Sequence, residues 1–139
     1  GGNGINDISV LTGLTNPEEL WLWGNDISDI SSLEGLTTLQ GLELGENNVS
    51  DISALAGLNN LAWLYLDTNN ISDISALAGL NNLEMLYLNN NNISDISALV
   101  DNVGLSNGDT VDLTGNPLSA ESINDYIPQL EERGVIVAY

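Results

Sequence analysis

Hydrophobic residues recur along this chain with a period of 22 residues, and this period divides the chain into copies of one unit. Each copy follows the pattern L-x-x-L-x-x-L-x-L-x-x-N-x-I-x-D-I-x-x-L-x-x. The complete copies are residues 14–35, 36–57, 58–79 and 80–101, with a half unit at 3–13 and a degenerate unit from Asn102. Repetition at this period predicts a solenoid in which each unit forms one turn and stacks on its neighbours.

Two leucines at alternate positions of each unit predict a short strand, because side chains two residues apart point to the same face. We expect these pairs to face a buried core: Leu20 and Leu22, Leu42 and Leu44, Leu64 and Leu66, Leu86 and Leu88, and Val111 and Leu113 in a last strand 111–113. The first leucine of each unit should fill the same core, namely Leu14, Leu36, Leu58 and Leu80. The return segment adds Ile30, Ile52, Ile74 and Ile96, followed by Leu33, Leu55, Leu77 and Leu99.

Two polar columns accompany the hydrophobic ones. An asparagine follows each strand, where its amide can satisfy backbone groups that the bend would leave unpaired: Asn25, Asn47, Asn69, Asn91 and Asn116. An aspartate precedes each return segment, where a short 3₁₀ turn fits better than a full helix: Asp7, Asp29, Asp51, Asp73 and Asp95. We interpret these aspartates as caps rather than as a calcium ladder, because each turn offers one carboxylate without a D-x-D cluster.

The last part of the chain changes character and predicts a C-terminal cap. Ser119 is a suitable N-cap for a helical stretch, and Pro128 within that stretch predicts two short helices, 120–127 and 128–133, or one kinked helix. Residues 135–139 should form a short strand. The expected organisation is therefore a partial repeat at 1–13, four repeats at 14–101, and a degenerate repeat with its cap at 102–139.

The repeat L-x-x-L-x-x-L-x-L-x-x-N-x-I-S-D-I-S-x-L resembles the 22-residue leucine-rich repeats of the internalins, which are listerial surface proteins. The ending N-P-L-S … I-P-x-L-x-x-x-G-V-x-V is similar to the caps of bacterial leucine-rich-repeat proteins. The resemblance implies an α/β fold: a right-handed solenoid with a concave parallel sheet, short 3₁₀ turns on the convex side and a helical C-terminal cap. It also implies protein recognition on the concave side and an extracellular or bacterial cell-surface location.

Two departures from the internalin pattern stand out. The helical N-terminal cap of the internalins is missing, and the residue after D-I-S is mostly alanine. Because the chain starts Gly-Gly-Asn without methionine, we expect it to be an excised or engineered piece of something larger.

The charge of the chain restricts its partners. The chain has twenty acidic residues and one basic residue, Arg133, which gives a net charge of −19. Without a stripe of lysine or arginine, binding to nucleic acid or to anionic membranes is not expected. Such a surface favours cationic partners and a monomeric state, although simple solubility or adaptation to salt is an alternative reason for the charge.

Differences between the copies concentrate on the strand positions that point away from the leucines. All three tryptophans, two tyrosines and the single methionine lie at these positions. Exposed aromatic residues in a contiguous patch usually mark a recognition surface, although aromatic ladders can also simply stabilise neighbouring strands. The partner-binding residues predicted on this basis are Trp21, Trp23, Glu43, Trp63, Tyr65, Asp67, Met85 and Tyr87.

Gly41 and Gly45 leave the second strand bare on both sides of Glu43. Between Trp21 and Trp23 on one side and Trp63 and Tyr65 on the other, we expect a notch with aromatic walls and a carboxylate floor. That combination suits the cationic side chain of a partner, through cation–π attraction and charge pairing. The alternative is that the glycines only accommodate their bulky neighbours.

Catalysis is not expected, because the chain has no histidine, cysteine or lysine, and we expect neither a cofactor nor a metal site. The leading hypothesis is a module that binds a protein or peptide, with a preference for a cationic partner. Two alternatives are carbohydrate binding, since tryptophan and tyrosine beside aspartate and asparagine suit sugar rings, and a structural or designed scaffold without its own ligand.

Overall fold

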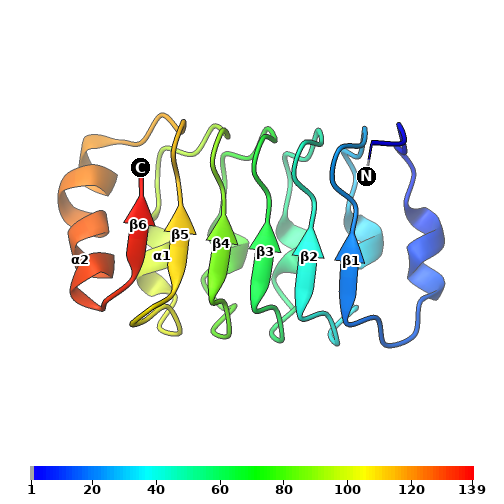
Figure 1. Cartoon of the computed structure of the whole chain (residues 1–139), viewed down its shortest axis with the longest axis horizontal. Helices are drawn as coiled ribbons and strands as arrows, with labels where there is room; N and C mark the ends of the chain where they lie inside the picture. The colour runs from blue at the N-terminus through cyan, green and yellow to red at the C-terminus, as the bar shows by residue number, and fades with distance from the viewer. Residues whose placement is uncertain (1) are drawn as a thin grey trace.

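A parallel sheet runs along the whole molecule, with one strand from each turn of the chain (Figure 1). The computed structural model describes residues 2–139, so Gly1 of the expected partial repeat lies outside the described residues. The strands follow one another in chain order across the sheet: β1 (Glu19–Trp21), β2 (Gly41–Glu43), β3 (Trp63–Tyr65), β4 (Met85–Tyr87), β5 (Thr110–Asp112) and β6 (Ile136–Ala138). The last repeat strand is thus one residue earlier than the predicted 111–113.

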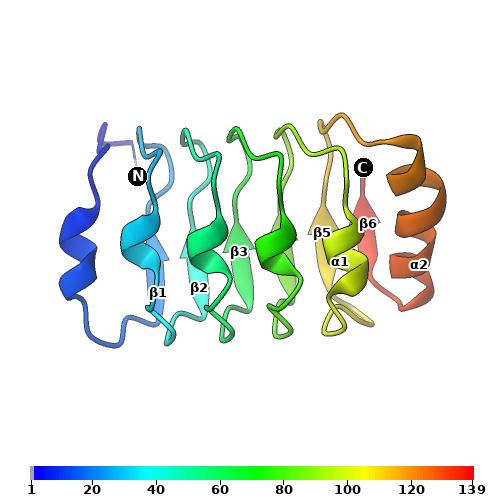
Figure 2. The same ribbon diagram turned by 180° about the vertical axis from the view of Figure 1, so that it is seen from behind.

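The strands pair in the register that the repeat predicts. Leu20 lies opposite Leu42, and Leu42 lies opposite Leu64, so equivalent positions of successive units are neighbours. The sheet forms one side of a right-handed solenoid, and the short helical segments form the other side, as the two opposite views show (Figures 1 and 2). The predicted fold class is confirmed.

The return segments form the predicted 3₁₀ turns: η1 (Ser9–Gly13), η2 (Ser31–Leu33), η3 (Ser53–Leu55) and η4 (Ser75–Leu77). The fourth unit differs, because its return segment is the α-helix α1 (Ser97–Asp101) rather than a 3₁₀ turn. This unit has Val100-Asp101 where the two preceding units have Ala-Gly. Without the glycine, which disfavours helix, the segment continues for a further half turn.

The aspartate column bonds to the start of these turns. In each case one carboxylate oxygen accepts a hydrogen bond from the backbone N–H of the serine two residues later, at 2.8 to 2.9 Å. The residue between them, an isoleucine, is the N-cap itself, so the aspartate lies one position earlier than a true cap. Within residues 2–139, no group of three or more acidic side chains is arranged to hold a metal ion.

The leucine and isoleucine columns form one continuous buried core along the solenoid axis. The prediction for Leu14 is wrong, because its side chain is 40% exposed, whereas Leu36, Leu58 and Leu80 are buried. Leu14 belongs to the first complete unit, and the half unit before it supplies a return segment but no strand to cover this position.

The asparagine column satisfies backbone groups in two turns at once. The amide nitrogen of Asn47 donates to the carbonyl oxygens of Leu44 in its own turn and Leu22 in the preceding turn, both at 3.0 Å. Its side-chain oxygen accepts from the backbone N–H of Ile27 at 3.0 Å. Because these groups are buried, pairing them removes a desolvation penalty. The structural interpretation of this column is confirmed.

The C-terminal cap is one continuous helical stretch, 120–132, rather than two helices. A π-helical segment, η5 (Ser122–Tyr126), leads directly into α2 (Ile127–Glu132). Proline donates no N–H and crowds the carbonyl four residues earlier, so the wider turn before Pro128 accommodates its ring. The hydroxyl oxygen of Ser119 accepts from the backbone N–H of Ser122 at 3.0 Å, which confirms the predicted cap. The strand predicted at 135–139 is β6.

Arg133, the single basic residue, joins the cap to the last repeat. Its guanidinium donates to the carbonyl oxygens of Val100 at 2.7 Å and of Asn102 at 3.2 Å, at the end of α1. The single basic side chain of the sequence is therefore used inside the fold. Among the described residues, the helices are all too short or too polar to span a bilayer.

Candidate recognition surface on the sheet

The side chains that point outward from the strands form rows across the sheet, and we call this surface the concave face. Strand register fixes two of the rows. The first contains Glu19, Gly41, Trp63, Met85, Thr110 and Ile136, and the middle one contains Trp21, Glu43, Tyr65, Tyr87, Asp112 and Ala138. A third row follows two residues further along: Trp23, Gly45, Asp67, Asn89 and Thr114. The structure thus brings all eight predicted partner-binding residues onto one face.

Large apolar side chains on the concave face remain accessible to solvent. Trp21 is 61% exposed, Trp23 47%, Met85 42% and Trp63 38%. The indole N–H of Trp21 donates to a carboxylate oxygen of Glu19 at 3.1 Å, which orients the ring. Side chains of this size, exposed on one face, are typical of a binding surface.

Two tyrosines on the same face do contact each other. The ring centroids of Tyr65 and Tyr87 are 5.0 Å apart with a tilt of 37°, and the Tyr65 hydroxyl lies 3.8 Å from the sulfur of Met85. Such a pair stabilises neighbouring strands and also presents aromatic surface to solvent. The two interpretations of the aromatic residues are therefore compatible at this pair.

The two glycines of β2 play different roles. At Gly41, a Cβ atom would lie 3.4 Å from Cε3 of Trp63 and 3.5 Å from Cγ of Glu19, so these neighbours already cover the position. The expectation of one notch across both glycines, with Trp63 as a wall, is wrong at this end. Gly41 accommodates its bulky neighbours, as the alternative interpretation proposed.

At Gly45 the face is hollowed. A depression of about 220 Å³ is lined by Trp21, Trp23, Glu43, Gly45, Glu46 and Asp67, and we call it the Gly45 hollow. Carboxylate oxygens of Asp67 and Glu43 lie 2.6 Å and 2.9 Å from where a Cβ of residue 45 would stand. The backbone N–H of Gly45 also donates to Glu43 at 2.8 Å. Two carboxylates thus converge over the glycine, beside two exposed indole rings.

The carboxylates of the Gly45 hollow repel one another. Partial burial raises the pKa of Glu43, and the neighbouring charges of Asp67 and Glu46 raise it further, against the hydrogen bond from Gly45 that lowers it. Burial also raises the pKa of Asp67, with Glu46 and Asp112 adding to the effect. A cation placed between these groups would relieve their mutual repulsion.

Glu46 is a lining residue that the sequence pattern did not reveal. It follows the last outward strand position, and its φ of 52° turns the chain sharply at that point. The equivalent residues Thr68 and Asn90 also have positive φ values, of 53° and 56°, whereas Gly24 and Gly115 occupy this position in other units. The glycines in two units were a signal that this position requires a left-handed conformation.

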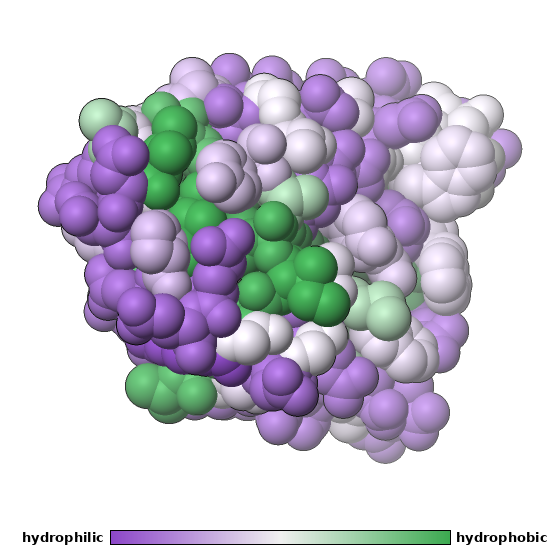
Figure 3. Space-filling model, turned by 60° about the vertical axis from the view of Figure 1, so that its left-hand side comes forward, coloured by the Kyte–Doolittle hydropathy of each residue, from purple (hydrophilic) through white to green (hydrophobic). Residues whose placement is uncertain are grey.

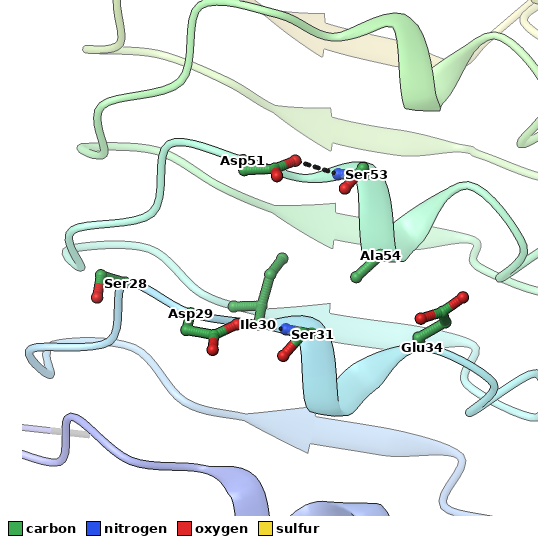
Figure 4. A pocket seen from close by; sticks show the side chains of 8 residues that line it. All are labelled: Ser28, Asp29, Ile30, Ser31, Glu34, Asp51, Ser53 and Ala54. Carbon is green, nitrogen blue, oxygen red and sulfur yellow. Dashed lines mark hydrogen bonds between the residues drawn. The ribbon is translucent and has the colours of Figure 1, made fainter.

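Shallow hollows also lie between successive turns on the convex side (Figure 4). Asp29, Ser31, Asp51 and Ser53 contribute polar atoms to one of them, together with Ser28, Ile30, Glu34 and Ala54. Figure 4 shows the carboxylate of Asp51 directed at the backbone nitrogen of Ser53. The same bond recurs at the equivalent aspartate of the other four units that have one, so these aspartates have a structural role that explains their presence.

Apolar surface continues toward the C-terminal end of the molecule. Figure 3, in which this end is turned forward, shows apolar side chains beside strongly hydrophilic ones. Ile136 is 61% exposed and continues the first row of the concave face beyond Thr110. The face therefore extends from β1 to the cap.

Two family models match overlapping parts of the chain. The model described as "Leucine rich repeat" matches residues 16–71, and the one described as "Leucine Rich repeats (2 copies)" matches residues 59–101. No curated protein sequence matches the chain significantly.

Solved structures of internalins from Listeria monocytogenes are similar to the chain. Internalin C2 is 32% identical with a TM-score of 0.75, and the match covers 99% of this chain and 67% of that one. The internalin inlF is also 32% identical, with a TM-score of 0.72 and coverage of 97% of this chain. This chain spans 45% of the length of that second internalin.

A more distant structure shares the fold alone. The ectodomain of the Arabidopsis thaliana receptor kinase GASSHO1/SCHENGEN3, solved in complex with CASPARIAN STRIP INTEGRITY FACTOR 2, is 23% identical with a TM-score of 0.73. The match covers 96% of this chain and 16% of the receptor.

Proposed function

Because the chain belongs to the leucine-rich-repeat family, with repeats of the internalin type, we propose that it is a recognition module whose concave face binds a protein or peptide. Exposure of three tryptophans and a methionine on one sheet face carries this proposal. Packing in the core fixes the inward leucine and isoleucine positions. It does not fix the outward positions of these aromatic residues, where small polar residues would be equally compatible with the fold. Aromatic residues and methionine are also the types enriched in protein interfaces.

The charge of the concave face supports a cationic partner. Glu19, Glu43, Asp67 and Asp112 lie on it, and no basic side chain lies on it, since Arg133 is bonded to carbonyl groups at the cap. Electrostatic complementarity of this kind directs encounter and selects partners more than it adds affinity. We propose a partner that presents lysine or arginine among apolar residues.

We also propose that the chain acts outside the cell or at a bacterial cell surface. This placement rests on the similarity to the two internalins of Listeria monocytogenes.

Carbohydrate binding is the second candidate. The tilted pair of Tyr65 and Tyr87 provides a platform for a sugar ring, and Asp67 and Asn89 beside it could accept or donate hydrogen bonds to hydroxyl groups. Unlike the leading proposal, this one makes no use of the net charge.

Parallel peptide and glycan arrays test both candidates. The wild-type chain should retain a set of basic peptides, and the double variant Trp21→Ala/Trp63→Ala should lose them. A matched control removes two exposed apolar side chains elsewhere, Val10→Ala/Val103→Ala, and should bind as the wild type does. Retention of glycans alone would favour the second candidate. Silence on both arrays would contradict the proposed function and leave a structural scaffold.

A further inference from the structure

We infer that the Gly45 hollow is the subsite for one arginine side chain of the partner, with the guanidinium held between the carboxylates of Glu43 and Asp67 beside Trp21 and Trp23. The inference rests on the proposed function of the concave face and adds the identity of the group that docks there. It commits this part of the face to one occupant.

The shape of the hollow follows from the missing Cβ of residue 45. Oxygens of both Asp67 and Glu43 lie within 3 Å of the position that this atom would fill. Any side chain at residue 45 would push the two carboxylates apart and occupy the floor between them. Glycine is therefore the residue that lets the two carboxylates converge over position 45, which they cover.

The chemistry of the lining favours guanidinium over ammonium. A guanidinium presents several N–H donors in one plane, so it can bond to two carboxylates while its flat face lies against an indole ring. Trp21 and Trp23 are both exposed and border the hollow on the β1 side. An ammonium group forms a compact point charge and would use the carboxylates without the same stacking.

Charge complementarity argues for a cation rather than for another apolar group. Glu43, Asp67 and Glu46 all border the hollow. Partial burial raises the pKa of both Glu43 and Asp67, and the nearby charge of Glu46 raises each further. The positive φ at Glu46 would suit glycine, as at Gly24 and Gly115, yet here the position carries an acidic residue that borders the hollow. A guanidinium would offset part of the negative charge that these three carboxylates place around the hollow.

The test uses a small probe, N-acetyl-arginine methylamide, and follows the indole N–H resonances of the three tryptophans by NMR. We expect saturable shifts at Trp21 and Trp23 and smaller ones at Trp63, which lies over Gly41. The lysine analogue should bind more weakly, and the neutral citrulline analogue should not saturate. Gly45→Ala should weaken the arginine probe by about tenfold or more, since it removes charge-assisted hydrogen bonds.

The matched control is Gly41→Ala, where the added Cβ meets its neighbours at ordinary contact distances. It should bind the arginine probe within about twofold of the wild type, because it leaves the charged hydrogen bonds intact. Glu46→Gly and its control Thr68→Gly form a second pair. Both remove a non-glycine residue from a positive φ, but only Glu46→Gly removes a carboxylate from the hollow. Equal binding by Gly45→Ala and Gly41→Ala, or saturation by citrulline, would overturn the inference. If the arrays yield peptides while this probe does not bind, the proposed function stands and the arginine subsite fails.

Discussion

The amide nitrogen of Asn69 donates to the carbonyl oxygen of Leu44 at 2.9 Å and so ties two successive turns of the solenoid together. Its side-chain oxygen accepts from the backbone N–H of Val49, also at 2.9 Å. Asn69→Ala would leave buried backbone groups unpaired and should lower the free energy of unfolding by about 3 kcal/mol. Urea unfolding measures this change.

The neighbouring residue provides the control for that prediction. Asn70 is exposed, and its backbone N–H bonds to Val49 independently of its side chain. Asn70→Ala should therefore change the free energy of unfolding by less than about 0.5 kcal/mol. Similar losses in the two variants would mean that the asparagine column does not couple the turns.

Relief of backbone strain should stabilise the protein at two positions. Glu46 and Thr68 adopt positive φ values, which glycine adopts freely but which most L-residues other than asparagine and aspartate rarely adopt. Replacement of either by glycine should raise the free energy of unfolding by about 0.5 to 1 kcal/mol, the left-handed penalty less the entropy of glycine. Thermal unfolding checks both variants, and a lower midpoint for Thr68→Gly would contradict the argument.

The cap should depend on Arg133 through hydrogen bonds rather than through ion pairing. Arg133→Gln removes donors to Val100 and Asn102 and should lower the free energy of unfolding by about 2 kcal/mol. Arg133→Lys keeps the charge but offers fewer donors, so its free energy of unfolding should lie between those of the wild type and Arg133→Gln. If lysine restored full stability, charge alone would explain the role of this residue.

Stability should be greatest at mildly acidic pH. The raised pKa values of Glu43 and Asp67 mean that their contribution favours the fold at low pH and is lost as the pH rises through those values. Backbone and side-chain hydrogen bonds from Ser31 and Ser53 lower the pKa values of Asp29 and Asp51 below 3.8. Their contribution is present above pH 3.8 and is lost as the pH falls through the lowered values. The melting temperature should therefore peak between these two ranges.

Glu43→Gln isolates the contribution of Glu43 to the loss of stability above the peak. Glutamine can still accept the hydrogen bond from Gly45 but carries no charge beside Asp67. The melting temperature of this variant should fall less than that of the wild type between the peak and neutral pH. An unchanged slope would show that the carboxylates of the Gly45 hollow do not set the pH dependence.

The repeat pattern was sufficient to predict the sheet, its register and the polar columns. One leucine pair per unit defines a strand, and a constant repeat length places Leu20 beside Leu42 and Leu42 beside Leu64. Side-chain exposure at the ends of the solenoid does not follow from this pattern. Leu14 matches it, yet it is 40% exposed, because no strand comes before β1 among residues 2–139.

The candidate site was predicted as a face but not in its detail. The alternation of side chains placed Trp21, Glu43 and Tyr65 in one row, as the register shows. The direction of the Trp63 ring over Gly41 depends on its rotamer, which a pattern of residue types does not specify. Glu46 also borders the hollow, at a position whose positive φ recurs in the other units and which the alternation of strand residues does not include.

Salt dependence of peptide affinity tests the central claim most directly. The measurement is the Kd of an array-selected peptide for the wild-type chain, by isothermal titration calorimetry, between about 50 mM and about 500 mM NaCl, a range over which screening of exposed charges increases strongly. If the acidic, aromatic concave face selects a cationic partner, the affinity should fall steeply with salt, and Glu43→Gln should reduce that dependence. An affinity that does not change with salt would contradict the account.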